Sequence, residues 1–169
     1  MKLRLLAILV LTFSMISSCE KEYPQIEIST EDYHNSVDKL TEVMIHDIFS
    51  PPVASRIYVY PNIAAYETLN QDNTTYKSLS QQLNDLELNE VVKTEHINLE
   101  LASIIAYIDV AKELVFSRDM IEAYRDSLYS EWKTENPNQF KSSKAYALGI
   151  SDQVKAWMGA DNYAETRTL

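Results

Sequence analysis

The sequence predicts an all-α protein, an antiparallel bundle of about five helices that follows a signal peptide and a short tether. Apolar residues recur at steps of three and four over long stretches, and β-branched residues do not alternate with polar ones. Glycine is rare, with two residues in 169. A chain of this length suffices for one domain with one packed core.

The N-terminus has the pattern of a lipoprotein signal peptide. Lys2 and Arg4 precede an apolar run that ends at Ile16, and Ser17-Ser18-Cys19 follows. The run is too short to cross a hydrocarbon core of ~30 Å. Residues 16–19 resemble a bacterial lipobox. We therefore expect residues 1–18 to be removed and Cys19 to carry a lipid, which would anchor the chain in the cell envelope at the outer membrane. The alternative is an ordinary cleaved signal with an incidental cysteine.

The charge is strongly acidic. The formal net charge is −10, and removal of residues 1–18 takes away two basic residues and no acidic one. Such a surface repels nucleic acid and anionic lipid head groups, so we expect no nucleic-acid partner and membrane contact only through the lipid anchor. Cys19 is the only cysteine, which excludes a disulfide within the chain.

Periodicity and capping residues divide the remaining chain. We expect a flexible tether over 19–30, a helical bundle over 31–160 and an extended tail over 161–169, which would be a truncation point. The expected helices run from about 31 to 49, from 52 to 69, from 92 or 94 to 115, from 117 to 135 and from 137 to a stop at Gly159, with a short helix over 76–83. The helix before residue 115 has apolar residues on most faces and should be the most buried.

Two segments have an unusual pattern of prolines, small residues and tyrosines: residues 45–58 (IHDIFSPPVASRIY) and 60–67 (YPNIAAYE). They resemble the N-terminal helical region of bacterial lipoproteins in the vanadium-dependent haloperoxidase and PAP2 phosphatase superfamily. The resemblance continues through Trp157 and residues 162–169. It implies a helical scaffold for a catalytic part that binds vanadate or a phosphoryl group.

The catalytic motifs implied by the resemblance do not occur in this sequence. They are a Lys with an Arg-Pro pair, a Pro-Ser-Gly-His segment, and a Ser-Arg pair followed closely by His. No Arg precedes a Pro, and neither Ser55-Arg56 nor Ser117-Arg118 has a His shortly after it. The resemblance therefore assigns no catalytic residue here and implies vanadate only for a full-length relative. We expect a catalytically incomplete scaffold whose partner is the missing C-terminal catalytic half or a second copy.

Three residues of the motif are candidate pocket or interface contacts: Arg56, His46 and Asp47. Arg56 either contacts an anion supplied by the missing half or pairs with Glu67, Asp47 or Glu42; an ion pair is the favoured interpretation, since a partly buried arginine is normally paired. His46-Asp47 is either a pair at a helix end or part of a metal site. The ordinary helix-end interpretation is favoured, so no metal is expected.

Two alternatives to the scaffold remain open. One is a standalone acidic helical lipoprotein that acts as a binding module in the envelope. The other is a small metal-dependent phosphohydrolase of the HD type, with His34, His46, Asp47 and Asp109 as ligands. The scaffold hypothesis makes a physical prediction of its own: the bundle should expose an apolar patch, on the helix over 52–67 or on the final helix.

Overall fold

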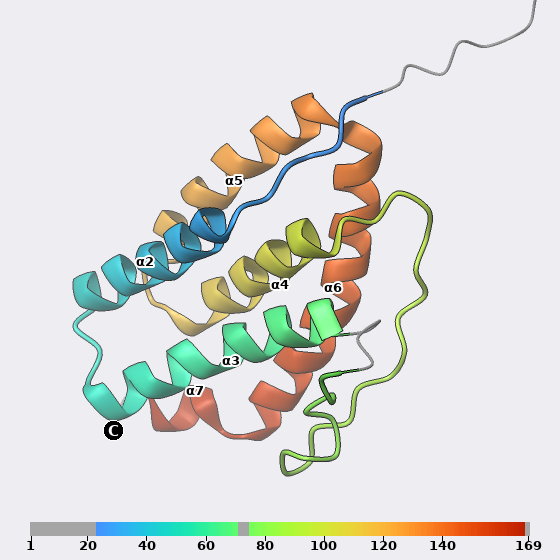
Figure 1. The fold of residues 1–169 in the computed structure, drawn as a ribbon. Coiled ribbons are helices and arrows are strands. Elements are labelled where there is room, and N and C mark those ends of the chain that lie inside the picture. The colour runs from blue at the N-terminus through green and yellow to red at the C-terminus, as the bar shows by residue number, and fades with distance from the viewer. Residues whose placement is uncertain (1–22, 71–74, 168–169) are drawn as a thin grey trace, which may run out of the picture.

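The computed structural model describes residues 23–70 and 75–167, and within them every regular element is a helix. The expected all-α bundle is confirmed (Figure 1). The helices are α2 (Thr30–His46), α3 (Pro51–Asn70), α4 (Leu99–Leu114), α5 (Arg118–Glu135), α6 (Pro137–Ala160) and the short α7 (Tyr163–Thr166). No helix in these two ranges is both long and apolar enough to cross a membrane.

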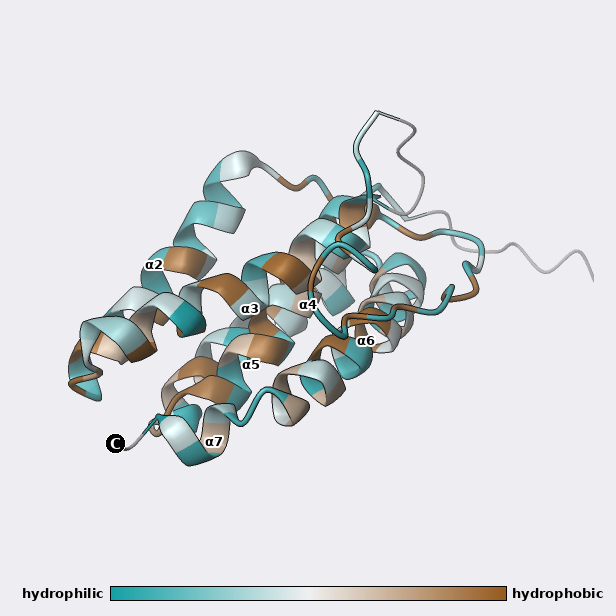
Figure 2. Cartoon of the chain, turned by 90° about the horizontal axis from the view of Figure 1, so that it is seen from below, coloured by the Kyte–Doolittle hydropathy of each residue, from teal (hydrophilic) through white to brown (hydrophobic). Residues whose placement is uncertain are grey.

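Helix α4 is the centre of the bundle. Every residue from Leu101 to Ala111 is buried, and α4 packs most extensively against α3 and α6. Figure 2 shows hydrophobic positions of these helices turned toward one another in the interior. A helix that is apolar all round is stable only when neighbours cover every face, so the expectation that this helix is the most buried is confirmed.

The start of α4 differs from the expected start near Val92 or Thr94. Asn98 is the true N-cap: its side-chain oxygen accepts from the backbone N–H of Leu101 at 2.9 Å. His96 has a φ of 67°, which is incompatible with a helix that continues upstream. The apolar residues before Asn98 had suggested an earlier start, but they pack as an extended segment.

Residues 75–98 form a long ordered connection rather than the short helix expected over 76–83. A single turn forms where the N–H of Leu83 donates to the carbonyl of Leu79. The positive φ values of Gln81 within this turn and of Asp85 after it are incompatible with a regular helix. The connection then runs over α6. Gly149 permits this close approach, because a Cβ there would lie 2.7 Å from Val91 Cγ1.

The flexible tether expected over 19–30 is wrong for residues 23–29, which pack on the bundle. Ile26 is only 2% exposed. Its N–H donates to Gln139 Oε1 at 2.6 Å, and its carbonyl accepts from Asn98 Nδ2 at 2.9 Å. Side chains of α4 and α6 therefore satisfy the extended backbone. Cys19 and the expected signal peptide lie outside the described residues.

The end of the chain also differs from expectation. Gly159 does not stop α6, which continues to Ala160; the turn follows at Asn162, whose φ of 52° is left-handed. Residues 163–166, expected to be extended, form α7. Tyr163 anchors this helix, since its ring is buried and its hydroxyl donates to the carbonyl of Leu114 at 2.8 Å.

Candidate interaction surface

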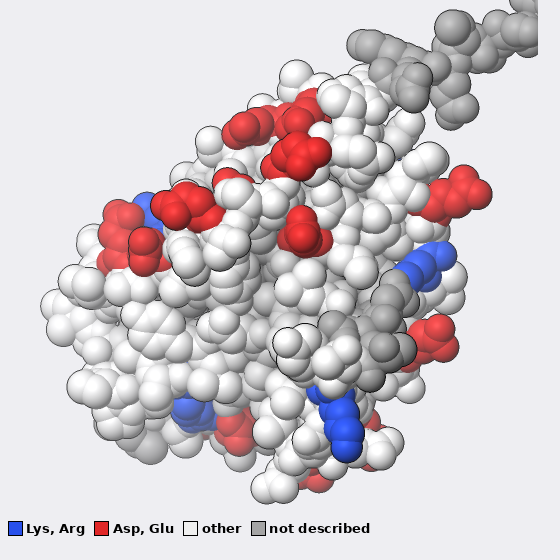
Figure 3. Space-filling view, in the orientation of Figure 1, with Lys and Arg blue, Asp and Glu red and all other residues white. Residues whose placement is uncertain are grey.

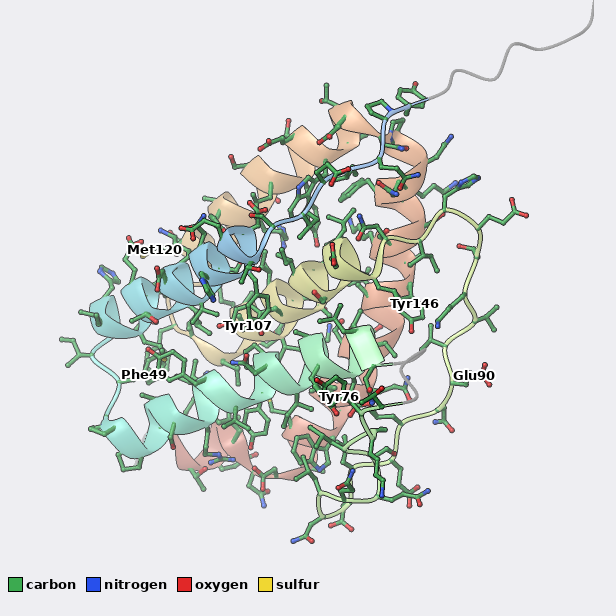
Figure 4. All side chains as sticks on the ribbon, viewed as in Figure 1. Phe49, Tyr76, Glu90, Tyr107, Met120 and Tyr146 are labelled. Atoms are coloured by element: carbon green, nitrogen blue, oxygen red, sulfur yellow. The ribbon has the colours of Figure 1, made fainter. Side chains whose placement is uncertain are left out.

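An exposed apolar surface lies at the end of the bundle where α2 is followed by α3. We call it the Ile48 surface and define it as Ile45, Ile48 and Phe116, which are 73%, 87% and 52% exposed, with the half-buried Phe49 beneath them. The rings of Phe49 and Phe116 stack with centroids 4.8 Å apart, and Figure 4 places Phe49 at this end. The end of α2, the α2–α3 connection and the α4–α5 connection therefore all contribute to this surface.

Ile48 combines exposure with backbone strain. Its φ is 57°, in the left-handed region where a β-branched side chain collides with the backbone. A strained residue persists only when its surroundings impose it, and such residues gather at binding and switch sites. A glycine or asparagine would relieve the strain, so Ile48 is unfavourable both for its backbone and for its exposure to water.

Asp47 fixes the geometry of this end. Its Oδ2 accepts from the backbone N–H groups of Phe116 at 2.7 Å and Ser117 at 3.0 Å, and its Oδ1 accepts from the Ser117 hydroxyl at 2.5 Å. Burial raises the pKa of the Asp47 carboxyl, but these hydrogen bonds outweigh it and hold the pKa below its usual value. Asp47 thus fixes the two residues that precede α5, while the Ser117 side chain makes no cap bond to that helix.

Arg56 joins α3 to the C-terminal segment. Its guanidinium donates to Asp161 Oδ2 at 2.8 Å, to the Asp161 carbonyl at 3.0 Å and to Thr166 Oγ1 at 2.6 Å, and it also bonds the hydroxyl of Tyr60. The Tyr60 hydroxyl in turn donates to Asp161. These hydrogen bonds lower the pKa of Asp161, the one from Tyr60 most. Arg56 forms an ion pair, as expected, but Glu67, Asp47 and Glu42 are not its partners.

The location of the apolar surface corrects the sequence prediction. The helix over 52–67 contributes one large exposed apolar residue, Val59, and among the described residues the final long helix contributes none. The main exposure is at the α2–α3 turn and Phe116. Arg167 lies over the Phe116 ring at 4.9 Å, so the last described residue is beside the Ile48 surface. His46 is exposed at the end of α2, next to Asp47.

The residues proposed for a metal site do not assemble. In the ranges that the structure describes, no three His, Cys, Asp or Glu side chains come together as ligands. The Asp47 carboxylate already accepts hydrogen bonds from Phe116 and Ser117, just before α5. Asp109 is buried and accepts from Lys112, Lys155 and Ser151, each at 2.7 Å. His34, His46, Asp47 and Asp109 therefore do not form the arrangement that an HD-type phosphohydrolase needs.

Comparison with known proteins finds a solved structure that this chain resembles. No protein-family model matches the chain, and no curated protein matches it. A solved structure described as that of the first bacterial vanadium-dependent iodoperoxidase does match. The identity is 50% and the TM-score 0.83, over 88% of this chain and 36% of that one. This chain therefore spans about a third of the length of the iodoperoxidase.

The described residues do not fit a vanadate site. An oxyanion of this kind needs several cations free to donate to it and a histidine beside them. A hollow of about 320 Å3 near the C-terminus is lined by Arg118, Lys155 and Arg167, and also by Glu113, but by no histidine. Arg118 pairs with Glu113, and Lys155 pairs with Asp109 and Asp152.

The relationship therefore rests on the fold and the sequence, since the helices of this chain and those of the iodoperoxidase superpose over nearly all of the chain. Half of the residues are identical, which is far above the level at which a shared fold alone would be inferred. This chain belongs to the vanadium-dependent haloperoxidase family and corresponds to part of the length of that member.

Proposed function

We propose that this chain is the helical scaffold portion of a haloperoxidase-type or PAP2-type protein and is catalytically incomplete alone. The Ile48 surface carries the proposal: it is apolar, exposed and strained. A bundle that functions alone has no use for such a surface, whereas a bundle that packs against a catalytic part does. The absence of the catalytic motifs from the sequence supports the same interpretation.

The Ile48→Gly substitution tests the role of the surface. It removes an exposed apolar side chain and the strain that isoleucine has at a positive φ. We therefore expect the free energy of unfolding to rise by about 1 kcal/mol. At the same time, self-association and binding of a hydrophobic dye by residues 19–169 should fall. The measurements are urea denaturation, sedimentation velocity and dye fluorescence.

Val92→Gly is the matched control, because Val92 is 82% exposed and also β-branched but lies on the 75–98 connection. It should leave association unchanged and lower stability slightly, through the entropy of the unfolded chain. If wild type is monomeric and binds no dye, the bundle needs no partner at this end. The alternative of a standalone binding module in the envelope would then be favoured.

We also propose that Cys19 carries the lipid that holds the chain at the envelope, with residues 16–19 as the segment that the lipidation machinery recognises. The expected result of Cys19→Ser is loss of the chain from the membrane fraction and of the mass increment of the lipid on its N-terminal peptide. Ser17→Ala, a neighbouring change that keeps the thiol, should leave both unchanged. Fractionation and mass spectrometry provide the measurements, and a membrane-bound Cys19→Ser chain would contradict the anchor.

A further inference from the structure

Three lysines gather where α5 meets α6. Lys133 on α5 and Lys141 and Lys144 on α6 line a groove of about 530 Å3. The rest of its lining is uncharged and largely apolar: Pro137, Asn138, Phe140, Ala145 and Leu148. We call this the lysine groove. It combines cations with an apolar floor, and no acidic residue lines it.

These lysines are not used in ion pairs within the described part of the chain. Lys39, Lys112 and Lys155, by contrast, all pair with carboxylates. Lys144 lies over aromatic rings, 4.8 Å from the centroid of Tyr129 and 5.8 Å from that of Phe140, which fixes its position at the groove. The groove therefore presents positive charge that forms no ion pair with a carboxylate of the described residues.

The N-terminal segment reaches the bundle at this same corner. Asn136, between α5 and α6, donates from Nδ2 to the carbonyl of Pro24 at 2.7 Å. The N–H of Ile26 bonds to Gln139 on the first turn of α6. Figure 1 shows the segment entering beside the junction of the two helices. Cys19 is four residues before Tyr23, a distance of at most ~14 Å along the chain. A lipid on Cys19 would hold this corner close to the membrane surface.

The charge of the groove is opposite to that of the molecule as a whole. The chain has a net charge of −10, and acidic side chains predominate on the face shown in Figure 3. Lysines near a membrane contribute on the order of 1 kcal/mol each toward binding anionic lipid. We propose that the lysine groove docks on anionic phospholipid head groups of the membrane that holds the anchor. This inference depends on the lipid anchor of the proposed function. The acidic chain as a whole is expected to repel anionic lipid, whereas the lysine groove would attract it.

The single cysteine allows a direct test. Residues 19–169 are coupled through the Cys19 thiol to vesicles that contain a maleimide lipid, with phosphatidylcholine alone or with phosphatidylglycerol added. Amine labelling followed by mass spectrometry then measures the accessibility of Lys133 and Lys141, with the exposed Lys77 as internal reference. We expect several-fold protection of the groove lysines on phosphatidylglycerol vesicles at low salt and no protection on phosphatidylcholine or at high salt. Equal labelling on both vesicles would overturn the proposal.

Matched variants separate the groove from net charge. Lys133→Gln with Lys141→Gln should weaken binding of the uncoupled chain to phosphatidylglycerol vesicles about tenfold or more. Lys39→Gln with Lys77→Gln removes the same charge elsewhere and should have little effect. Equal loss in both pairs would overturn the proposal, and so would the same protection from soluble glycerol phosphate. Because the coupling is chemical, these results do not depend on whether cells attach a lipid to Cys19, which the Cys19→Ser experiment decides.

Discussion

Replacement of Asp109 by alanine is expected to lower the free energy of unfolding by about 3 kcal/mol. Asp109 lies on α4 and is 3% exposed; its carboxylate accepts from Lys112, Lys155 and Ser151. Its removal leaves two partly buried ammonium groups without their common counterion and a serine hydroxyl on α6 without its acceptor. Urea denaturation followed by circular dichroism gives the measurement.

Asp152→Ala is the control for Asp109→Ala, because Asp152 is exposed and pairs with the same Lys155 at 2.8 Å. A solvent-exposed pair contributes less than about 1 kcal/mol, so this variant should remain close to wild type. Equal losses from the two substitutions would mean that the buried position of Asp109 is not what matters.

The Asp109 carboxylate should also make the free energy of unfolding depend on pH, in a direction that its pKa shift defines. Burial raises the pKa of Asp109, but hydrogen bonds from Lys112, Lys155 and Ser151 outweigh it and keep the pKa below its usual value. The folded state therefore binds the proton less readily than the unfolded chain. The stabilisation is complete above the unfolded pKa of about 4 and is lost as the pH falls through the folded value. Asp109→Asn should show a smaller loss of stability below about pH 4 than wild type.

The long helices were predictable because their signals are local. The apolar period identified α4, and Pro137 marked the first residue of α6, where Asn136 caps by accepting from the N–H of Gln139 at 3.0 Å. Helix α2 ended earlier than expected, at His46, because Ile48 adopts a left-handed backbone and the Asp47 carboxylate binds the backbone N–H groups of Phe116 and Ser117. That reason depends on a contact with a residue about seventy positions away.

The extended segments were not predictable for the same reason. Residues 23–29 have no helical period and were predicted to be a tether, yet side chains from distant parts of the chain satisfy their backbone. The connection over 75–98 behaves alike: the N–H of Asn89 donates to Gln153 Oε1 at 2.7 Å, and Trp157 Nε1 donates to the carbonyl of Asn84 at 2.9 Å. Polar side chains of α6 hold this backbone, and hydrophobic periodicity carries no information about such bonds.

The candidate site was predictable in its residues but not in its contacts. The two motif segments over 45–67 contain the residues that matter here. Asp47 binds the segment before α5, Ile48 is part of the exposed surface, and Arg56 joins α3 to the C-terminal segment. The kind of interaction expected for Arg56 was right, but its partner Asp161 is 105 residues away. The strain at Ile48 left one sequence signal, an isoleucine in a turn between two helices, where glycine or asparagine is the ordinary choice.

Glu67→Ala is expected to cost about 3 kcal/mol, comparable to Asp109→Ala, and to release the connection after α3. Glu67 ends the second motif segment and is 0% exposed. Its Oε1 accepts from the backbone N–H of Leu79 at 2.6 Å, and its Oε2 accepts from the Ser78 hydroxyl at 2.8 Å. Removal of the carboxylate would leave a cavity and a backbone donor without its acceptor.

Hydrogen exchange distinguishes this release from a general loss of stability. In Glu67→Ala, amides over 76–90 should exchange faster by a larger factor than those of α4, because the connection loses its attachment while α4 keeps its neighbours. Gln82→Ala is the control on the same connection, since Gln82 is exposed and bonds only locally, to the carbonyl of Ser78. It should leave both rates near wild type. Uniform acceleration across α4 and the connection in Glu67→Ala would show that Glu67 supports the core as a whole. The connection would then be held by its other contacts with α6, such as the two hydrogen bonds between the Asn89 backbone and the Gln153 side chain.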